Sequence, residues 1–232
     1  MIILALDSTA TTASAALCRD SHLLAMTTLN GGLTHSETLL PIIQQLFEHT
    51  GLEIRDVDLF ATSSGPGSFT GVRIGAATIK GLAFGRGKPC VGVSSLLALA
   101  HNLSACEGII CPVMNARRNQ VYNALFEAHD GRLTRLCPDR AISVPELCGQ
   151  IENESRPVFV CGDGVGLMDE LPSHPVTEML IWQNAYSVAQ CALEQYNNGQ
   201  YTNDIALSPT YLRMPQAERE RLERLNNTKG EA

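Results

Sequence analysis

The chain has 232 residues, of which 44% are hydrophobic and 18% are charged, and its formal net charge is −7. This length suits two lobes of about 100 residues each better than one compact core. The negative charge, and the lack of any stripe of Lys and Arg, argue against a chain that binds RNA phosphates by itself.

No sequence feature of export or membrane insertion is visible. The first residues reach Asp7 without a positively charged segment, so they do not form a signal peptide. Apolar stretches fall short of the roughly 18 residues that a membrane-spanning helix requires. We therefore expect a cytoplasmic protein whose eight cysteines are reduced and mostly buried, rather than ligands of a metal.

The first half of the chain alternates between strand-like and helical patterns. Three strand-like runs, separated by short polar turns, come first (residues 2–7, 13–19 and 23–29). Thr34 and Glu37 then have the spacing of a capping box, which predicts a helix through Phe47 that ends at Gly51. A buried strand is expected next, at residues 57–62.

A glycine-rich turn follows this strand and leads into a second helix. Gly65 and Gly67 flank Pro66, so the backbone can reverse sharply, and Ser68 or Thr70 can cap the helix. The spacing of the glycines fits neither a P-loop nor a dinucleotide-binding fingerprint, and no serine stands in a nucleophile elbow.

Strand-like runs recur in the second half, at residues 109–114, 120–128 and 158–161. The order of three strands, a helix, a strand and a helix resembles the ribonuclease-H-like lobe shared by actin, Hsp70 and sugar kinases (the ASKHA fold). This resemblance implies an α/β protein with two such lobes, the second one diverged. We expect an N-terminal lobe at 1–105, a C-terminal lobe at 106–215 and a charged tail at 216–232.

The run from Gly65 to Gly75 resembles the signature of the TsaB (YeaZ) family, bacterial proteins that work with TsaD and TsaE to make threonylcarbamoyladenosine in tRNA. Four further segments resemble that family in the same order (residues 3–9, 35–41, 92–96 and 209–213). The resemblance implies a non-catalytic subunit that supports TsaD while a threonylcarbamoyl group is transferred to the adenosine beside the anticodon. It implies contact with tRNA only through the complex.

In the ASKHA superfamily the acid after the first strand belongs to a phosphate-binding hairpin, which makes Asp7, Ser8 and Thr9 the candidates for a cofactor site. Nucleotide-binding members commonly have glycine in this turn, so Asp7 as a strand-end turn residue is an equal alternative. A glycine loop around Asp163 could face a nucleotide across the cleft. We expect no cofactor in the isolated chain, and ATP or ADP at a junction with TsaD.

TsaD carries two metal-binding histidines four residues apart near the start of a helix. By the resemblance, Ser95 and Leu99 stand at those positions here, and a leucine side chain cannot bind a metal. We therefore expect no catalytic residue and no metal site. A small ATPase or kinase-like enzyme of the same fold is the main alternative, and a peptidase of the M22 type is a weaker one.

The two predicted helices are the candidates for a partner surface. Gly71 and Gly75 share one helical face, which lets another backbone approach closely, although packing on the chain's own sheet explains them equally well. Leu39, Ile42 and Leu46 form a wide apolar face on the preceding helix. We expect these five residues to contact TsaD, or a second copy of the chain in a homodimer.

Overall fold

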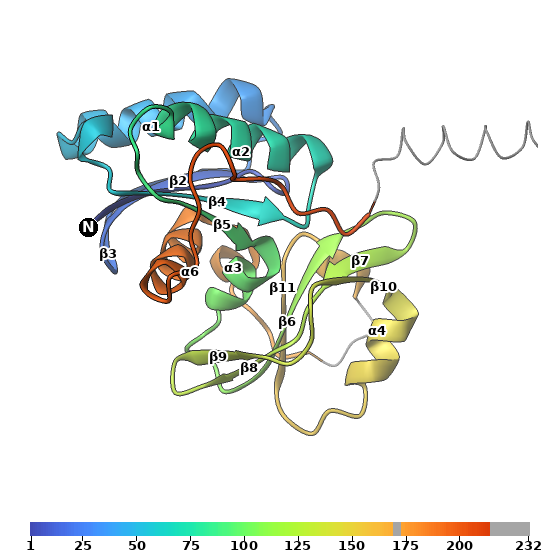
Figure 1. The fold of residues 1–232 in the computed structure, drawn as a ribbon. Coiled ribbons are helices and arrows are strands. Elements are labelled where there is room, and N and C mark those ends of the chain that lie inside the picture. The colour runs from blue at the N-terminus through green and yellow to red at the C-terminus, as the bar shows by residue number, and fades with distance from the viewer. Residues whose placement is uncertain (169–172, 214–232) are drawn as a thin grey trace, which may run out of the picture.

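The computed structural model describes residues 1–168 and 173–213, which form two β-sheets with helices around them (Figure 1). The first sheet has the order β3-β2-β1-β4-β5, in which β1, β4 and β5 are parallel and β1, β2 and β3 are antiparallel neighbours. Its strands are β1 (Ile2–Asp7), β2 (Ala13–Arg19), β3 (His22–Leu29), β4 (Leu59–Gly65) and β5 (Cys90–Ser94). The expected strands of this half are confirmed.

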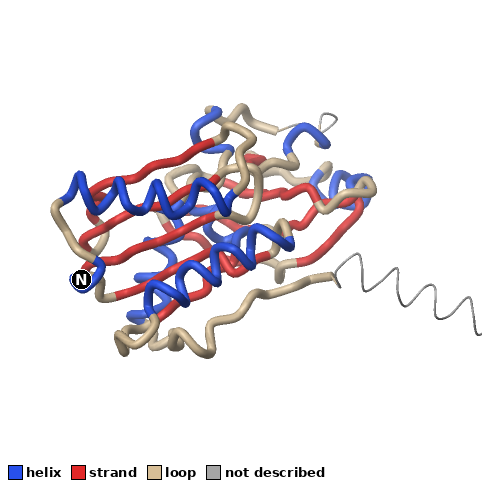
Figure 2. Tube along the Cα trace, turned by 90° about the horizontal axis from the view of Figure 1, so that it is seen from above, coloured by secondary structure: helices blue, strands red, loops and turns tan. Residues whose placement is uncertain are grey.

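Two long helices lie side by side on one face of the first sheet, α1 (His35–Thr50) and α2 (Phe69–Ala83) (Figure 2). Helix α1 ends at Gly51, whose φ of 67° lets its N–H reach the carbonyl of Phe47. Thr34 is the N-cap as expected, but its hydroxyl donates to the Glu37 carboxylate at 2.5 Å and caps no backbone N–H.

The opposite face of the first sheet is covered by α6 (Ala185–Asn197), which comes from much later in the chain (Figure 1). Small residues of α6, including Ala189 and Ala192, pack on Ile3 and Ala61 of the sheet. The range 106–215, expected to be one C-terminal lobe, therefore contributes to both lobes. The expected tail at 216–232 lies outside the described residues.

The second sheet is built around β6, which pairs with β7 and β8 on one edge and with β11 on the other. Strand β9 pairs with β8 and β10 pairs with β7. The strands are β6 (Gly108–Asn115), β7 (Gln120–Asn123), β8 (Phe126–His129), β9 (Arg132–Arg135), β10 (Arg140–Ser143) and β11 (Val158–Cys161).

The single strand expected at residues 120–128 is two strands, and Pro112 supplies the reason. β7 and β8 pair with β6 in the same register, Val113 with Asn123 and Ile110 with Phe126. Between these pairs lies Pro112, which has no N–H for the ladder. Leu125 bonds elsewhere: its N–H donates to the Cys137 sulfur and its carbonyl accepts from Leu136.

Helix α3 (Ser95–His101) joins the two lobes, and its Leu96 and Leu99 pack with Ile110 and Phe126 of the second sheet. The remaining helices are α4 (Val144–Ile151), α5 (Glu178–Ile181) and the 3-10 turns at Ile54–Asp56 and Val165–Leu167. In the described part of the chain, no helix is both long enough and apolar enough to cross a membrane.

Candidate functional site

A cleft of about 530 Å³ lies between the two lobes. Five segments line it: the β1–β2 turn, the start of α2, the stretch from the end of β6 into β7, the loop after β11 and the last described residues of the chain. Its polar side chains include Thr9, Ser68, Thr70, Asn115, Arg117, Asp163, Thr210 and Arg213.

The glycine-rich turn forms one wall of the cleft, and its glycines are required by close backbone contacts. A Cβ on Gly67 would lie 2.4 Å from the carbonyl oxygen of Thr9, and one on Gly65 would lie 2.4 Å from that of Thr210. The Ser68 hydroxyl caps α2 by accepting a hydrogen bond from the N–H of Gly71 at 3.3 Å, which confirms the predicted cap.

Asp7 is fully buried behind this wall, at the end of β1. One carboxylate oxygen accepts hydrogen bonds from the N–H and hydroxyl of Thr9, at 2.9 and 2.8 Å, and the other accepts one from the Ser63 hydroxyl. Burial raises the pKa of Asp7, and these hydrogen bonds partly offset the effect. Both oxygens are thus engaged within the chain, which favours the turn-residue interpretation.

The other two cofactor candidates have separate positions. The Ser8 hydroxyl is buried and donates to the carbonyl of Gly71 at 2.9 Å, whereas Thr9 lines the cleft. From the other lobe Asp163 also lines the cleft, and its carboxylate accepts a long hydrogen bond (3.4 Å) from the N–H of Asn115. Burial raises the pKa of Asp163 as well.

The five residues expected at a partner interface lie in the interior, so that expectation needs correction. The side chains of Leu39, Ile42 and Leu46 are only 1–3% exposed because they pack on the first sheet. A Cβ on Gly71 would lie 2.0 Å from the Ser8 carbonyl oxygen, and one on Gly75 would lie 2.6 Å from the Ser8 hydroxyl. The close approach that these glycines permit is made by the chain's own β1–β2 turn.

The same two helices expose a different set of residues on their outer face. On α1, Leu40 is 57% exposed and is followed by the exposed Pro41 and Gln44. On α2, Ala77 is exposed and Gly81 has open space where a Cβ would stand, while Phe84, just past the end of the helix, is 75% exposed. We call these six residues the outer helix face. Each of the two helices packs one face on the sheet. Helical periodicity therefore places the buried residues on that face and these six residues on the opposite one.

Residues 203–213 form a C-terminal strap that returns to the first lobe and then crosses to the second. The Lys80 ammonium donates to the carbonyls of Ile205 and Leu207, at 2.9 and 3.0 Å, and the N–H of Thr210 donates to Ser64 at 2.7 Å. The Arg213 guanidinium donates to the Ala116 carbonyl in the second lobe at 2.9 Å.

The strap also contacts α2 through Tyr211. Its ring lies 4.9 Å from that of Phe69, and its hydroxyl accepts a hydrogen bond from Arg73 at 2.9 Å. The sequence of residues 209–213 marks them only as a family-like segment, because nothing local to the sequence indicates which helix they contact.

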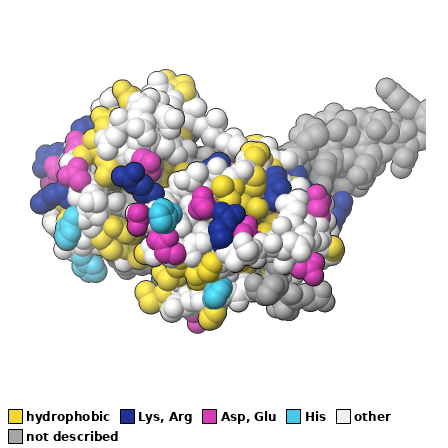
Figure 3. Space-filling model, turned by 90° about the horizontal axis from the view of Figure 1, so that it is seen from below, with side chains coloured by type: hydrophobic (Ala, Val, Ile, Leu, Met, Phe, Trp, Pro, Cys, Tyr) yellow, Lys and Arg dark blue, Asp and Glu magenta, His cyan; other side chains and the backbone are white. Residues whose placement is uncertain are grey.

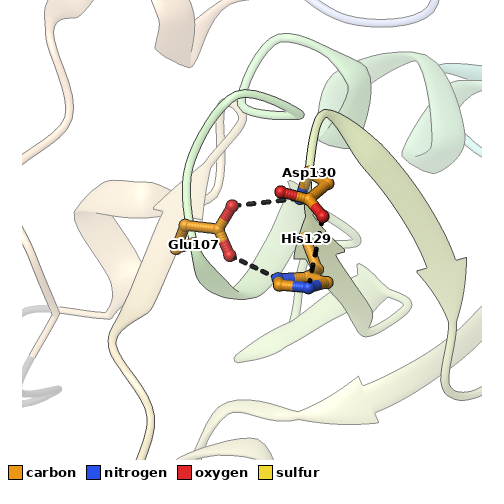
Figure 4. Close-up of side chains that lie close together, drawn as sticks. All are labelled: Glu107, His129 and Asp130. Carbon is orange, nitrogen blue, oxygen red and sulfur yellow. Dashed lines mark hydrogen bonds and ion pairs between the residues drawn. The ribbon is translucent and has the colours of Figure 1, made fainter.

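A separate charge cluster lies at the exposed β8–β9 turn, where Glu107, His129 and Asp130 meet (Figure 4). The Glu107 carboxylate contacts Nδ1 of His129 at 2.7 Å and accepts from the N–H of Asp130 at 3.0 Å. The hydrogen bond to Glu107, together with the charges of Asp130 and Glu107, raises the pKa of His129.

The two proposed metal-ligand positions of the resemblance, Ser95 and Leu99, are both in the interior. Leu99 belongs to the hydrocarbon core around α3. The hydroxyl of Ser95 is fully buried.

Strand order 3-2-1-4-5 in the first sheet, with a reduced version of the same arrangement around β6, defines an α/β protein with two ribonuclease-H-like lobes of the ASKHA type. Residues 30–214 match the family model described as "TsaD: tRNA N6-adenosine threonylcarbamoyltransferase".

Comparison with individual relatives identifies the family within this class. The chain is 32% identical over 171 residues to the tRNA threonylcarbamoyladenosine biosynthesis protein TsaB of Bacillus subtilis, covering 74% of this chain and 75% of the relative. It is 28% identical over 225 residues to TsaB of Haemophilus influenzae, covering 92% and 94%. The solved structure of YeaZ from Pseudomonas aeruginosa aligns with a TM-score of 0.77 and 26% identity, covering 91% of this chain and 99% of that one. Within the wider TsaD-related family, the chain belongs to the TsaB (YeaZ) family.

Proposed function

We propose that this chain is a non-catalytic subunit of the machinery that makes threonylcarbamoyladenosine in tRNA, and that it binds and supports TsaD together with TsaE. The names of its relatives in Bacillus subtilis and Haemophilus influenzae support the pathway. The observation that carries the role of a binding subunit is the outer helix face, where apolar and small residues stand exposed on two adjacent helices.

The environments of Leu99 and Asp7 support the proposal that TsaD, and not this chain, is the catalytic subunit. Leu99 fills a hydrocarbon core at the position where the resemblance places a metal ligand. Asp7 has both carboxylate oxygens engaged by Thr9 and Ser63 and is not exposed to the cleft. Neither residue offers a free ligand atom for a catalytic ion. We propose that a nucleotide used by the complex binds at the junction with TsaD.

The outer helix face suits a helix-packing contact. Ala77 and Gly81 are four residues apart on α2, so they lie on the same side of the helix and leave room for a partner backbone. Leu40 and Phe84 would add apolar area to this contact. The same face would serve a homodimer when TsaD is absent.

We propose that tRNA is held mainly by the other subunits. The formal net charge of the chain is −7, and charged side chains of both signs are interspersed on the face shown in Figure 3. Phosphate affinity depends on clustered positive charge, which such a surface does not provide over the span of a tRNA.

Gel filtration of the chain with TsaD from the same source tests the assembly. We expect a stable complex that Gly81→Leu weakens about tenfold or more, because a close-packed contact has no space for the added carbons. Gly149→Leu is the matched control, since Gly149 also lies exposed within a helix, α4, with open space at its Cβ, but on the second lobe. Equal affinity of both variants for TsaD would remove the outer helix face from the interface.

A further inference from the structure

Strand β3 forms one edge of the first sheet (Figure 1). It pairs with β2 on its inner side, and no strand among the described residues pairs with it on its outer side. The backbone N–H and C=O groups that β3 directs away from β2 therefore have no protein partner in this part of the chain. Such a row of donors and acceptors is a template for one further strand.

Sheet edges elsewhere in the molecule are covered or charged, and β3 is neither. At the opposite edge of the first sheet, Cys90 of β5 exchanges two backbone hydrogen bonds of 2.8 Å with Thr202 of the same chain. In the second sheet, the edge strand β9 carries Arg132 and Arg135. Residues 21–34, which include all of β3, contain no Lys, Arg, Asp, Glu or Pro. Natural edge strands use such residues to prevent pairing, so β3 is an edge that stays open to it.

The open edge has a defined start and end. A β-bulge leaves Leu24 without a partner residue on β2, and regular pairing then runs from Ala25 to Leu29. A pocket of about 290 Å³ follows at the end of the strand, between the β3–α1 loop and the start of β2. Leu29 and Leu33 form its apolar wall, and Leu33 is 65% exposed.

These features specify the chemistry of an occupant. The outward backbone groups of β3 require an extended segment, because only a strand presents donors and acceptors at the matching spacing. The residues from Ala25 to Leu29 and the residues that line the pocket include no charged side chain. A charged occupant would lose hydration here without gaining an ion pair, so an uncharged segment with a bulky apolar side chain fits this surface best.

We propose that Ala25–Leu29 is a docking edge for an extended segment of a partner protein. The segment adds a sixth strand to the first sheet and places an apolar side chain in the pocket beside Leu33. A second copy of the chain fits less well. If two β3 strands pair symmetrically about Thr27, the bulge residue Leu24 of one copy falls opposite Asn30 of the other, beside the pocket, and interrupts the pairing there. This docking edge is separate from the outer helix face and goes beyond the proposed subunit role.

Fluorescence anisotropy with the full chain tests the docking edge. The probe is a labelled short peptide of alternating threonine and leucine, and the control probe has proline at every third position, which removes N–H groups that pairing needs. We expect the first peptide to bind and the second to fail. Leu33→Asp should raise the dissociation constant of the first peptide about tenfold or more, because it places a charge in the pocket wall. Leu136→Asp is the matched control, since Leu136 is also exposed (45%) but lies in the second lobe.

Amide hydrogen exchange shows whether the peptide pairs as a strand. We expect the bound peptide to slow exchange at the outward-directed amides between Ala25 and Leu29, with little change at Asn123 in the second sheet. Met26→Lys gives the edge the charge that protected edges carry, so it should weaken binding while its melting temperature stays close to that of the native chain.

The proposal is overturned if the alternating peptide does not bind at millimolar concentration, or if the amides between Ala25 and Leu29 gain no protection. It is also overturned if Leu136→Asp weakens binding as much as Leu33→Asp does. Protection of the same amides that rises with the concentration of the chain, in the absence of peptide, would contradict it as well, because a second copy would then occupy the edge.

Discussion

A methyl group on Gly75 of α2 would lie 2.6 Å from the hydroxyl oxygen of Ser8, closer than side-chain atoms pack in proteins. The contact joins the β1–β2 turn to a helix that lies more than 60 residues later in the chain. The glycine is therefore part of the fold, and its substitution is expected to act on stability first.

Gly75→Leu should lower the free energy of unfolding by about 1–3 kcal/mol, because overpacking forces the helix away from the turn. Urea denaturation measures the change. Gly81→Leu on the same helix is the control, since its side chain would enter open space and should cost less than about 1 kcal/mol. A Gly75→Leu chain as stable as the Gly81→Leu chain would mean that the turn and helix do not pack as described.

Asp7 gives a prediction about pH. Burial raises the pKa of its carboxyl above the ordinary 3.8, so the folded chain holds this proton more tightly than the unfolded chain does. Stability from this group is therefore fully present below pH 3.8 and is lost as the pH rises through the folded-state pKa.

The non-titrating variant Asp7→Asn isolates this effect. In urea denaturation at successive pH values, the stability of the native chain relative to Asp7→Asn should be greatest below pH 3.8 and should decline as the pH rises above it. If the stability of the native chain relative to Asp7→Asn instead increases with rising pH, the three hydrogen bonds to the carboxylate outweigh its desolvation.

The sequence predicted most of the first lobe because its signals are local. Apolar runs specify β1 and β4, and Gly51 and Ser68 specify a helix end and a helix start. The sequence around a small residue does not show which segment packs against it. Gly71 and Gly75 predict a close approach correctly, but whether Ser8 or another chain makes it depends on how the β1–β2 turn folds over α2.

The residues of the candidate site are likewise predictable only where the signal is local. The turns that hold Thr9 and Asp163 predict these two residues, whereas no local pattern in the sequence indicates that Arg117 and Arg213 line the cleft. Their proximity depends on a strap that leaves α6 and crosses both lobes. Pro112 is a further local signal, because a proline inside a strand has no N–H and so indicates a break in the strand that pairs with it.

The Lys80 ammonium holds the strap through two hydrogen bonds, so replacing Lys80 should make the strap more mobile where it lines the cleft. Lys80→Met keeps the aliphatic stem but loses the hydrogen bonds to the carbonyls of Ile205 and Leu207. We expect the amide of Thr210, which is bonded to Ser64, to exchange its hydrogen several-fold faster, with little change at Asn123 in the second sheet. Unchanged exchange at Thr210 would show that Lys80 does not hold the strap.

The charge cluster of Figure 4 predicts a histidine that titrates above its ordinary value. The hydrogen bond from His129 to Glu107 raises the pKa of His129 above 6.5, so the protonated ring is favoured in the fold. This contribution to stability is present below pH 6.5 and is lost as the pH rises through the raised pKa. An NMR titration should show the shift in the native chain and a lower pKa in Glu107→Gln. An identical pKa in both chains would contradict the coupling.

We propose that this chain supports a catalyst and is not one itself. Reconstituted tRNA modification with TsaD and TsaE, measured as threonylcarbamoyladenosine formed per minute, tests it most directly. We predict that leaving out the chain reduces the rate more than tenfold, and that the chain alone forms no product and hydrolyses no ATP. Full activity of TsaD and TsaE without the chain, or ATP hydrolysis by the lone chain that Asp7→Ala abolishes, would contradict the account.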